Sequence, residues 1–298
     1  MDENKIDQLK REYMNIPIPA ELEFKVKESL KEGKRAVNKK IYTRRLLSTV
    51  ASAAVIATVF TVGINTNEAM AETLSEIPIL GSIVKVLTFK EYNFNDNTYD
   101  VNIETPAITG LENKNLQNSL NDKYLSENKE LYEQFMNDMK DLEENGGGHM
   151  GVSSGYVVKT DTDKILSVGR YVVNTVGSSS TTFRYDTIDK KNEVLITLPS
   201  LFKDESYVDI ISSNIKEQMV EQHNADEAKI YWVEGIENEL TELFDKISKD
   251  QSFYISSNGK LIISFDKYEV APGYMGVVEF EIPTEILNDI LVSNEYIK

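Results

Sequence analysis

The longest apolar stretch of the chain is residues 46–64, LLSTVASAAVIATVFTVGI, in which no side chain is charged. At about 1.5 Å of rise per residue, a helix of this length reaches roughly 28 Å, which matches the hydrocarbon thickness of a bilayer. The alternative is a buried helix of a soluble domain. Such a helix normally keeps a polar stripe, whereas nothing here is more polar than serine or threonine. The pattern therefore predicts one transmembrane helix.

Basic residues on one side of this stretch predict its orientation. No Lys or Arg follows it before Lys85, whereas the preceding residues include Lys34, Arg35, Lys39, Lys40, Arg44 and Arg45. A secretory signal peptide is the competing interpretation, because the triplet Ala69-Met70-Ala71 resembles a signal peptidase site. The 45 residues before the stretch are far more than a signal peptide needs. We therefore expect a single-pass protein of the cell membrane, with a cytoplasmic N-terminus and an extracellular C-terminal domain.

The segment before the span, residues 1–45, has its own hydrophobic pattern. Residues 3–14 and 20–37 are predicted to form two short amphipathic helices, separated by Ile16-Pro17-Ile18-Pro19. Such helices cannot close a core by themselves, so we expect them to bind another protein. The alternative is a disordered tail whose basic end lies on anionic lipid. The candidate contact residues are Leu9, Tyr13, Leu22, Phe24, Val26 and Leu30.

The chain after the span is expected to comprise a juxtamembrane region, residues 65–92, and a folded domain, residues 93–298. Alternating and helical periodicities follow one another in the domain, with Gly, Ser, Asn and Asp at the turns. The predicted fold is α+β, with helices packed on antiparallel sheets. Helices are predicted at 115–144, 205–222, 237–249 and from Thr284. Strands are predicted at 99–103, 152–160, 164–174, 181–188, 193–198, 253–255, 260–270 and 274–282, with a turn at Gly177-Ser178-Ser179-Ser180.

Charge separates the two sides of the span. The whole chain carries −17, residues 1–45 carry +4, and the remainder carries −21. An acidic domain repels nucleic acid and attracts cationic proteins, although acidity also simply keeps a domain soluble. With no cysteine, disulfides and thiolate zinc sites are excluded. The only histidines, His149 and His223, are not spaced as metal ligands are. The sequence also shows no phosphate-binding loop and no catalytic constellation. We therefore predict that the protein has no cofactor and no metal, and that it is not an enzyme.

Three segments carry a resemblance to a known family. They are REYMNIPIPAELEFKVKESL, AMAETLSEIPILGSIVKVLTF and FDKYEVAPGYMGVVEFEIP, which with the single span cover nearly the whole chain. In these segments the chain resembles the anti-sigma-V family of membrane-bound, lysozyme-sensing anti-sigma factors. The last motif is typical of the ectodomain, which also occurs in other cell-surface proteins, so the N-terminal segment carries the anti-sigma assignment.

The resemblance implies a signalling route. The cytoplasmic segment would hold an extracytoplasmic-function (ECF) sigma factor away from RNA polymerase, and lysozyme binding outside would expose the boundary. Signal peptidase would then cut between Ala71 and Glu72, with Ala69 and Ala71 in its small pockets, and an intramembrane protease would release the sigma factor. The same resemblance implies lysozyme contacts at Pro272, Tyr274, Ser178, Ser179 and Ser180.

Two other functions stay open from the residues alone. One is an anchored or secreted lysozyme inhibitor without a signalling role, which leaves the helices at 3–14 and 20–37 without a function. The other is a cell-wall enzyme, for which the sequence shows no catalytic constellation.

Overall fold

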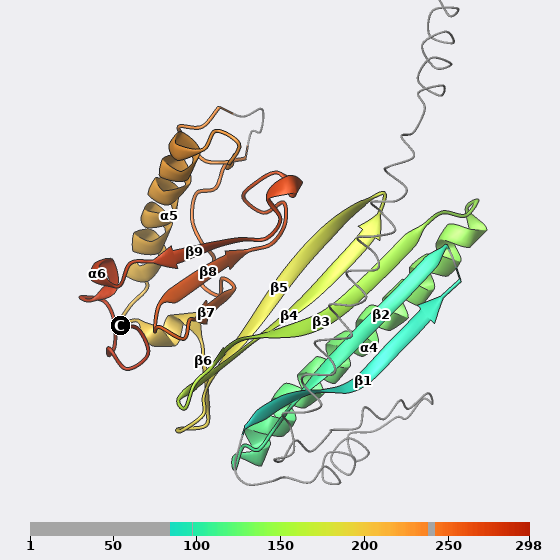
Figure 1. The fold of residues 1–298 in the computed structure, drawn as a ribbon, viewed down its shortest axis with the longest axis horizontal. Coiled ribbons are helices and arrows are strands. Elements are labelled where there is room, and N and C mark those ends of the chain that lie inside the picture. The colour runs from blue at the N-terminus through green and yellow to red at the C-terminus, as the bar shows by residue number, and fades with distance from the viewer. Residues whose placement is uncertain (1–83, 97, 238–241) are drawn as a thin grey trace, which may run out of the picture. The chain divides into compact units, whose positions relative to one another are not determined.

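The computed structural model describes residues 84–96, 98–237 and 242–298. Their main element is a six-stranded sheet whose strands follow one another in chain order (Figure 1). The predicted strands at 99–103, 152–160, 164–174, 181–188 and 193–198 are confirmed, and most extend further than predicted. The strands are β1 (Lys85–Asn95), β2 (Tyr99–Thr109), β3 (Met150–Asp161), β4 (Ile165–Val176), β5 (Ser178–Asp189) and β6 (Val194–Ile196). The folded domain was expected to begin at residue 93, but strand β1 begins at Lys85, so the sheet includes part of the expected juxtamembrane region.

The sheet is mixed, whereas the sequence predicted antiparallel sheets. Strands β2 and β3 pair in parallel from Tyr99 opposite Met150 to Ile103 opposite Ser154, and every other neighbouring pair is antiparallel. The chain between them is the helix α4 (Lys114–Glu144), which returns it to the starting end of β2. A long crossover of this kind is what a parallel pair requires.

Helix α4 confirms the prediction of a helix at 115–144 and lies along β2 (Figure 1). It begins where the Asn113 side chain accepts a hydrogen bond from Leu116 N–H (3.2 Å), and it ends before glycines 146 and 147, both with positive φ. Its buried face includes Leu120, Tyr124 and Phe135. These side chains belong to the hydrophobic clusters that join the helix to the sheet.

The C-terminal half forms a second, three-stranded antiparallel sheet of β7 (Phe253–Ile255), β8 (Leu261–Phe265) and β9 (Val278–Ile282). Helix α5 (Ser206–Ala225) confirms the predicted helix at 205–222 and packs on this sheet through a stripe at helical spacing, Tyr207, Ile211, Ile215 and Met219. The predicted terminal helix is the short α6 (Thr284–Leu287), and two 3₁₀ turns lie at Leu198–Leu201 (η1) and Gly273–Met275 (η2).

The predicted helix at 237–249 is wrong for the described residues 242–249, which form no helix. Their backbone groups are used by distant partners instead. Phe244 N–H donates to the Trp232 carbonyl (2.7 Å), and Ile247 N–H donates to the Ser212 hydroxyl (2.9 Å). Long-range hydrogen bonds thus replace the local ones that the spacing of apolar residues predicted.

The two sheets meet at Glu279, a residue of β9. Its carboxylate accepts hydrogen bonds from Tyr185 of β5 (2.9 Å) and Tyr254 of β7 (3.0 Å), and it pairs with Lys159 of β3 (2.7 Å). Burial, helped by the negative charge of Glu279, raises the pKa of both tyrosines well above the usual range. Both hydroxyls therefore stay protonated donors and join the sheets through one carboxylate.

Several predictions fall on residues outside the described ranges. These are the transmembrane helix at 46–64, the helices at 3–14 and 20–37, and the cleavage triplet at 69–71. Across residues 84–96, 98–237 and 242–298, none of the helices combines the length and the apolarity that crossing a bilayer requires.

Candidate functional site

The candidate site is the connection between β8 and β9, residues 266–277, here called the late loop. The sequence predicted strands as far as residue 270 and again from residue 274, but β8 ends at Phe265 and β9 begins at Val278. Tyr268 (φ 72°) and Gly276 (φ 68°) leave the extended region of backbone conformation. Between them the chain forms the 3₁₀ turn Gly273–Met275 in place of continuous strands.

The late loop is anchored on the outer edge of β5. The Asp266 carboxylate accepts hydrogen bonds from the backbone N–H of Phe183 (2.7 Å) and from the guanidinium of Arg184 (2.8 Å). The backbone N–H of Lys267 donates to the Thr181 carbonyl (2.9 Å). Strand β6 pairs only with Thr187–Asp189, so the loop contacts a part of the β5 edge that β6 leaves uncovered.

Tyr274 is the more exposed of the two tyrosines of the loop, with 66% of its surface accessible against 44% for Tyr268. Its hydroxyl donates to the Ala228 carbonyl (2.8 Å), in the segment that follows α5. Pro272, half-buried, comes directly after the buried Val270 and Ala271. The turn thus presents the aromatic ring of Tyr274, whose hydroxyl is held by a hydrogen bond. Pro272 restricts the backbone just before the turn.

The predicted turn at residues 177–180 is wrong in its extent. Gly177 alone makes the reversal, with φ 72°, because Val176 and Ser178 are already opposite each other in the ladder. Ser178, Ser179 and Ser180 therefore belong to strand β5. The hydroxyl of Ser179 accepts a hydrogen bond from the Lys267 ammonium (2.9 Å), so the structure does bring this serine strand next to the late loop.

Sequence reasoning missed the residues that join these parts. Lys267, Tyr268 and Ala228 lie in the site but were not singled out, and nothing in the local pattern distinguishes them. Acidic groups near the loop were recognised only as part of the net charge: Asp226 and Glu227 precede Ala228, and Glu269 follows Tyr268, all three exposed. Because Lys229 and Lys267 lie in the same two segments, the charges around the two tyrosines are of both signs, with carboxylates in the majority.

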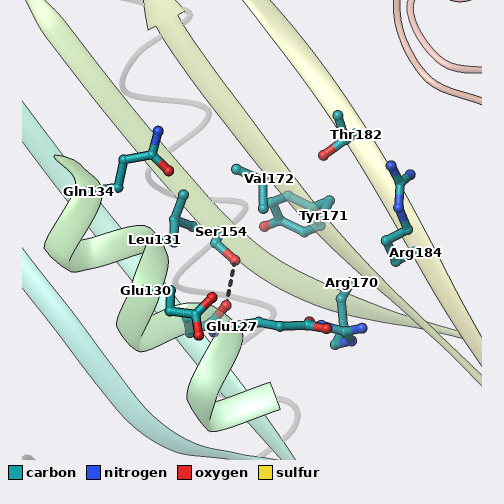
Figure 2. Close-up of a pocket in the computed structure, with 11 residues that line it drawn as sticks. Glu127, Glu130, Leu131, Gln134, Ser154, Arg170, Tyr171, Val172, Thr182 and Arg184 are labelled. Atoms are coloured by element: carbon teal, nitrogen blue, oxygen red, sulfur yellow. Dashed lines mark hydrogen bonds and ion pairs between the residues drawn. The ribbon is translucent and has the colours of Figure 1, made fainter. Parts of the chain in front are cut away.

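A groove of about 270 Å³ lies beside α4, where the helix leaves β4 and β5 uncovered. Figure 2 shows helix side chains on one wall and strand side chains on the floor. It is lined by polar and apolar groups of Glu127, Asn128, Glu130, Leu131, Gln134, Ser154, Arg170, Tyr171, Val172, Thr182 and Arg184.

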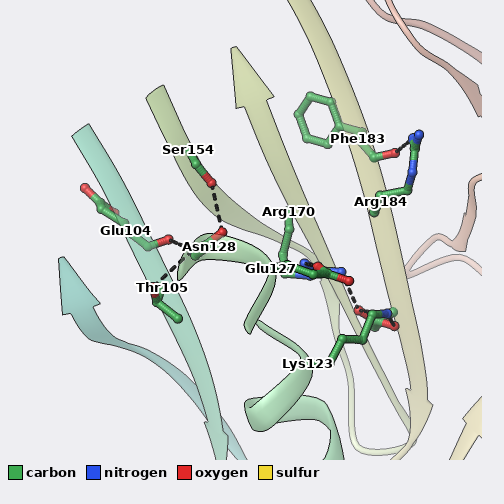
Figure 3. Close-up of polar contacts among 10 residues, drawn as sticks. Glu104, Thr105, Lys123, Glu127, Asn128, Ser154, Arg170, Phe183 and Arg184 are labelled. Atoms are coloured by element: carbon green, nitrogen blue, oxygen red, sulfur yellow. Dashed lines mark hydrogen bonds and ion pairs between the residues drawn. The ribbon is translucent and has the colours of Figure 1, made fainter. Parts of the chain in front are cut away.

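Charges at the inner end of the groove are paired with one another (Figure 3). Arg170, whose side chain is only 10% exposed, pairs with Glu127 and with Asp186 (3.4 Å), and Lys123 pairs with Asp186 as well (3.0 Å). The Arg170 guanidinium also lies 4.3 Å from the ring centroid of Tyr124, whose pKa is raised well above its usual value chiefly by burial. This network joins α4 to β4 and β5.

A buried amide completes the contacts of α4 near the groove (Figure 3). The Asn128 side chain donates to the Glu104 carbonyl (3.2 Å) and the Thr105 hydroxyl (3.1 Å), and it accepts from Ser154 (3.5 Å).

Among the described residues, no three His, Cys, Asp or Glu side chains are grouped as a metal ion would need.

The predicted cleavage residues Ala69, Ala71 and Glu72 lie outside the described residues. The same holds for the predicted sigma-binding residues Leu9, Tyr13, Leu22, Phe24, Val26 and Leu30. Of the predicted site residues, the structure places only Pro272, Tyr274 and the three serines.

Comparison with known proteins first defines the class of the domain. Residues 199–285, which include α5 and the late loop, match the DUF3298 family model, described as a protein of unknown function. A solved DUF3298 protein of Bacteroides fragilis NCTC 9343 is 16% identical, with a TM-score of 0.51 over 71% of this chain and 94% of its own, which shows a shared fold. A DUF3298 structure from Pseudomonas aeruginosa PAO1 is 14% identical with a TM-score of 0.49, over 72% of this chain and 97% of its own.

A much closer relative defines the family. The anti-sigma-V factor RsiV of Bacillus subtilis (strain 168) is 44% identical over 297 residues, which are 99% of this chain and all of the relative. The chain therefore belongs to the anti-sigma-V factor family, as the three resemblance segments predicted.

Proposed function

We propose that the protein is a single-pass membrane anti-sigma factor that also acts as a lysozyme receptor. Residues 1–45 hold an ECF sigma factor in the cytoplasm, residues 46–64 span the membrane, and the extracellular domain binds lysozyme. Binding permits signal peptidase to cut after Ala71, and an intramembrane protease then releases the sigma factor. The observation that carries the proposal is the 44% identity to RsiV, which extends far beyond the DUF3298 match at residues 199–285.

Two features of the domain support a cationic protein ligand. The chain after residue 45 carries a net charge of −21, which favours encounter with a strongly basic protein. The late loop presents Tyr274, a large amphipathic side chain with few rotamers to lose, beside the rigid Pro272. Exposed tyrosines of this kind are common hot spots of interfaces.

The ligand assignment is tested with Tyr274→Ala in the full chain, held in detergent micelles and titrated with hen-type lysozyme. We expect binding to weaken by at least about 1 kcal/mol without loss of folding, because an interface anchor is removed. Tyr274→Phe, which loses only the hydrogen bond to Ala228, and Val194→Ala, an exposed apolar side chain on β6, serve as controls. Unchanged affinity of Tyr274→Ala would show that this residue is not part of the binding site. If the wild type does not bind lysozyme at any salt concentration, lysozyme is not the ligand.

The anti-sigma role is tested by purifying the full chain from cells and identifying what accompanies it. We expect an ECF sigma factor, and we expect the double variant Leu22→Asp, Val26→Asp to lose it because the apolar stripe is broken. Lysozyme binding by this variant is the internal control. If the wild type retains lysozyme but never carries a sigma factor, the protein is an anchored inhibitor instead.

The cleavage step is tested with Ala71→Trp, whose side chain is too large for a peptidase pocket that accepts alanine. We expect lysozyme to stop inducing the processed fragment. Met70→Trp is the matched control, because the middle residue of an A-x-A site does not enter the small pockets. Processing of Ala71→Trp at the same bond would show that the cut lies elsewhere.

A further inference from the structure

Tyr268 in the late loop has an unusual backbone conformation. Its φ of 72° lies in the left-handed region, and among the described residues other than glycine only Glu193 shares a positive φ. A bulky aromatic residue there is strained, and such strain persists only where the surroundings impose it. The residue is also 44% exposed, so burial of a large apolar surface does not explain the conformation.

The ring of Tyr268 lies against Gly273, the residue just before Tyr274. A Cβ atom added to Gly273 would come within 2.2 to 2.4 Å of three side-chain atoms of Tyr268, namely two ring carbons and the hydroxyl oxygen. Contact this close is possible only with glycine at position 273. The ring therefore supports the 3₁₀ turn Gly273–Met275 that presents Tyr274.

The neighbouring Lys267 ties the same ring to the serine strand. Its ammonium lies 5.1 Å from the centroid of the Tyr268 ring and donates to the Ser179 hydroxyl at 2.9 Å. Its backbone N–H donates to the Thr181 carbonyl at 2.9 Å. The dipeptide Lys267-Tyr268 thus contacts both the serine strand and the turn that carries Tyr274.

We propose that Tyr268 is a positioning residue for protein recognition: its ring holds the Pro272–Tyr274 turn and, with Lys267 bound to Ser179, keeps this turn and the Ser178–Ser180 strand together as one preformed surface for a cationic protein. The proposal rests on the proposed function, since it concerns the same binding site. The acidic neighbours Asp226, Glu227 and Glu269 are exposed near this surface and suit a basic partner. Preformation raises affinity because the loop then loses less conformational entropy when it binds.

The first test compares Tyr268→Asn and Tyr268→Phe with the wild-type full chain in detergent micelles, with hen-type lysozyme as the probe. Asparagine tolerates the left-handed backbone but has no ring. We expect its melting temperature to equal or exceed that of the wild type and its affinity to fall about tenfold, mainly through faster dissociation. Phenylalanine keeps the ring, so Tyr268→Phe should bind like the wild type.

Outcomes of this first test separate a positioning role from a structural one. A variant Tyr268→Asn that binds as tightly as the wild type overturns the inference and leaves the proposed function intact. A variant that melts earlier and also binds weakly shows a merely structural residue, which overturns the inference too. A wild type that does not bind lysozyme overturns the proposed function itself.

The second test is a double-mutant cycle with Gly273→Ala. Alone, this substitution should weaken lysozyme binding about tenfold, because the added methyl group displaces the Tyr268 ring. Combined with Tyr268→Asn it should cause no further loss, since the ring that it displaces is absent. Full additivity of the two effects would show that the ring and Gly273 act independently, contrary to the proposal.

Discussion

Replacement of Asp266 by alanine should loosen the late loop from the edge of β5. The carboxylate has two partners of different kinds: the half-buried backbone N–H of Phe183 and the guanidinium of Arg184, which is 62% exposed. Loss of a charge-assisted hydrogen bond that leaves a backbone N–H without a partner costs about 1.5–3 kcal/mol. The exposed ion pair contributes at most about 1 kcal/mol. We therefore expect Asp266→Ala to lower the free energy of unfolding by about 2–3 kcal/mol.

Two further variants separate these contributions. Asp266→Asn keeps an oxygen that accepts from Phe183 N–H but loses the ion pair. Arg184→Ala loses the ion pair and the hydrogen bond from the guanidinium to the Phe183 carbonyl (2.6 Å), but that carbonyl still accepts from the Ser252 hydroxyl (2.8 Å). Both should therefore lower the free energy of unfolding by less than about 1 kcal/mol. Urea titration of the full chain in detergent, followed by the fluorescence of Trp232, the only tryptophan, reports on this region. The backbone N–H of Trp232 donates to the Val270 carbonyl of the late loop at 2.8 Å.

The relative size of the three effects decides whether the reasoning holds. If Asp266→Asn destabilises as strongly as Asp266→Ala, the negative charge and not the acceptor for Phe183 anchors the loop. The proposed lysozyme binding should weaken in the same order, because a loop that has lost its anchor must be ordered again on binding. An Asp266→Ala variant with full stability and full affinity would refute the anchoring role.

Two other predictions concern the sheet. Asp189 is fully buried, and although burial raises its pKa, hydrogen bonds from Asn192, Tyr296 and Lys191 lower the pKa below the usual value. Its carboxylate therefore stabilises the fold above about pH 4 and loses this effect as the pH falls through the folded-state pKa. In urea titrations, Asp189→Asn should lower the free energy of unfolding by roughly 1–3 kcal/mol at pH 7 and by much less near pH 2. Gly169→Ala places a Cβ 2.6 Å from the Tyr185 ring and should lower the urea stability by about 1–3 kcal/mol, whereas an unchanged midpoint would show that the ring moves freely.

Local patterns predicted the elements whose stabilising contacts repeat along the chain. Helix α5 carries its core stripe at Tyr207, Ile211, Ile215 and Met219, so helical periodicity alone places it. The strands predicted at 253–255 and from residue 260 pair as the hairpin of β7 and β8, and the Asn258-Gly259 dipeptide between them is a local signal for such a turn, since Gly259 has a positive φ of 74°. In both cases the deciding contacts lie within a few residues of each other.

Elements decided by distant partners could not be predicted in this way. The apolar spacing at 242–249 resembles a helix, but Phe244 and Ile247 donate to groups from other parts of the chain. The parallel pairing of β2 and β3 is another case, since α4 could have returned the chain to either end of β2. Spacing within a segment holds no information on such partners.

The candidate site shows the same division. Pro272 and Tyr274 were found through a family resemblance, and the structure adds their setting: a 3₁₀ turn, an exposed ring and a restrained hydroxyl. Tyr268 had no local signal, because its positive φ opposes the preference of an aromatic residue. Only the contact of its ring with Gly273, seen in the structure, explains why a tyrosine occupies this position.

Edge protection and recognition are linked in this fold through β5. An uncovered strand edge is a template for pairing with another chain. Here the N–H of Phe183 is bonded to the Asp266 carboxylate, its carbonyl accepts from Ser252 (2.8 Å), and the Thr181 carbonyl accepts from Lys267. Because Asp266 and Lys267 begin the late loop, the contacts that cover the edge also fix the base of the loop that carries Tyr274. A change that frees the edge of β5 should therefore promote aggregation and weaken the proposed lysozyme binding together.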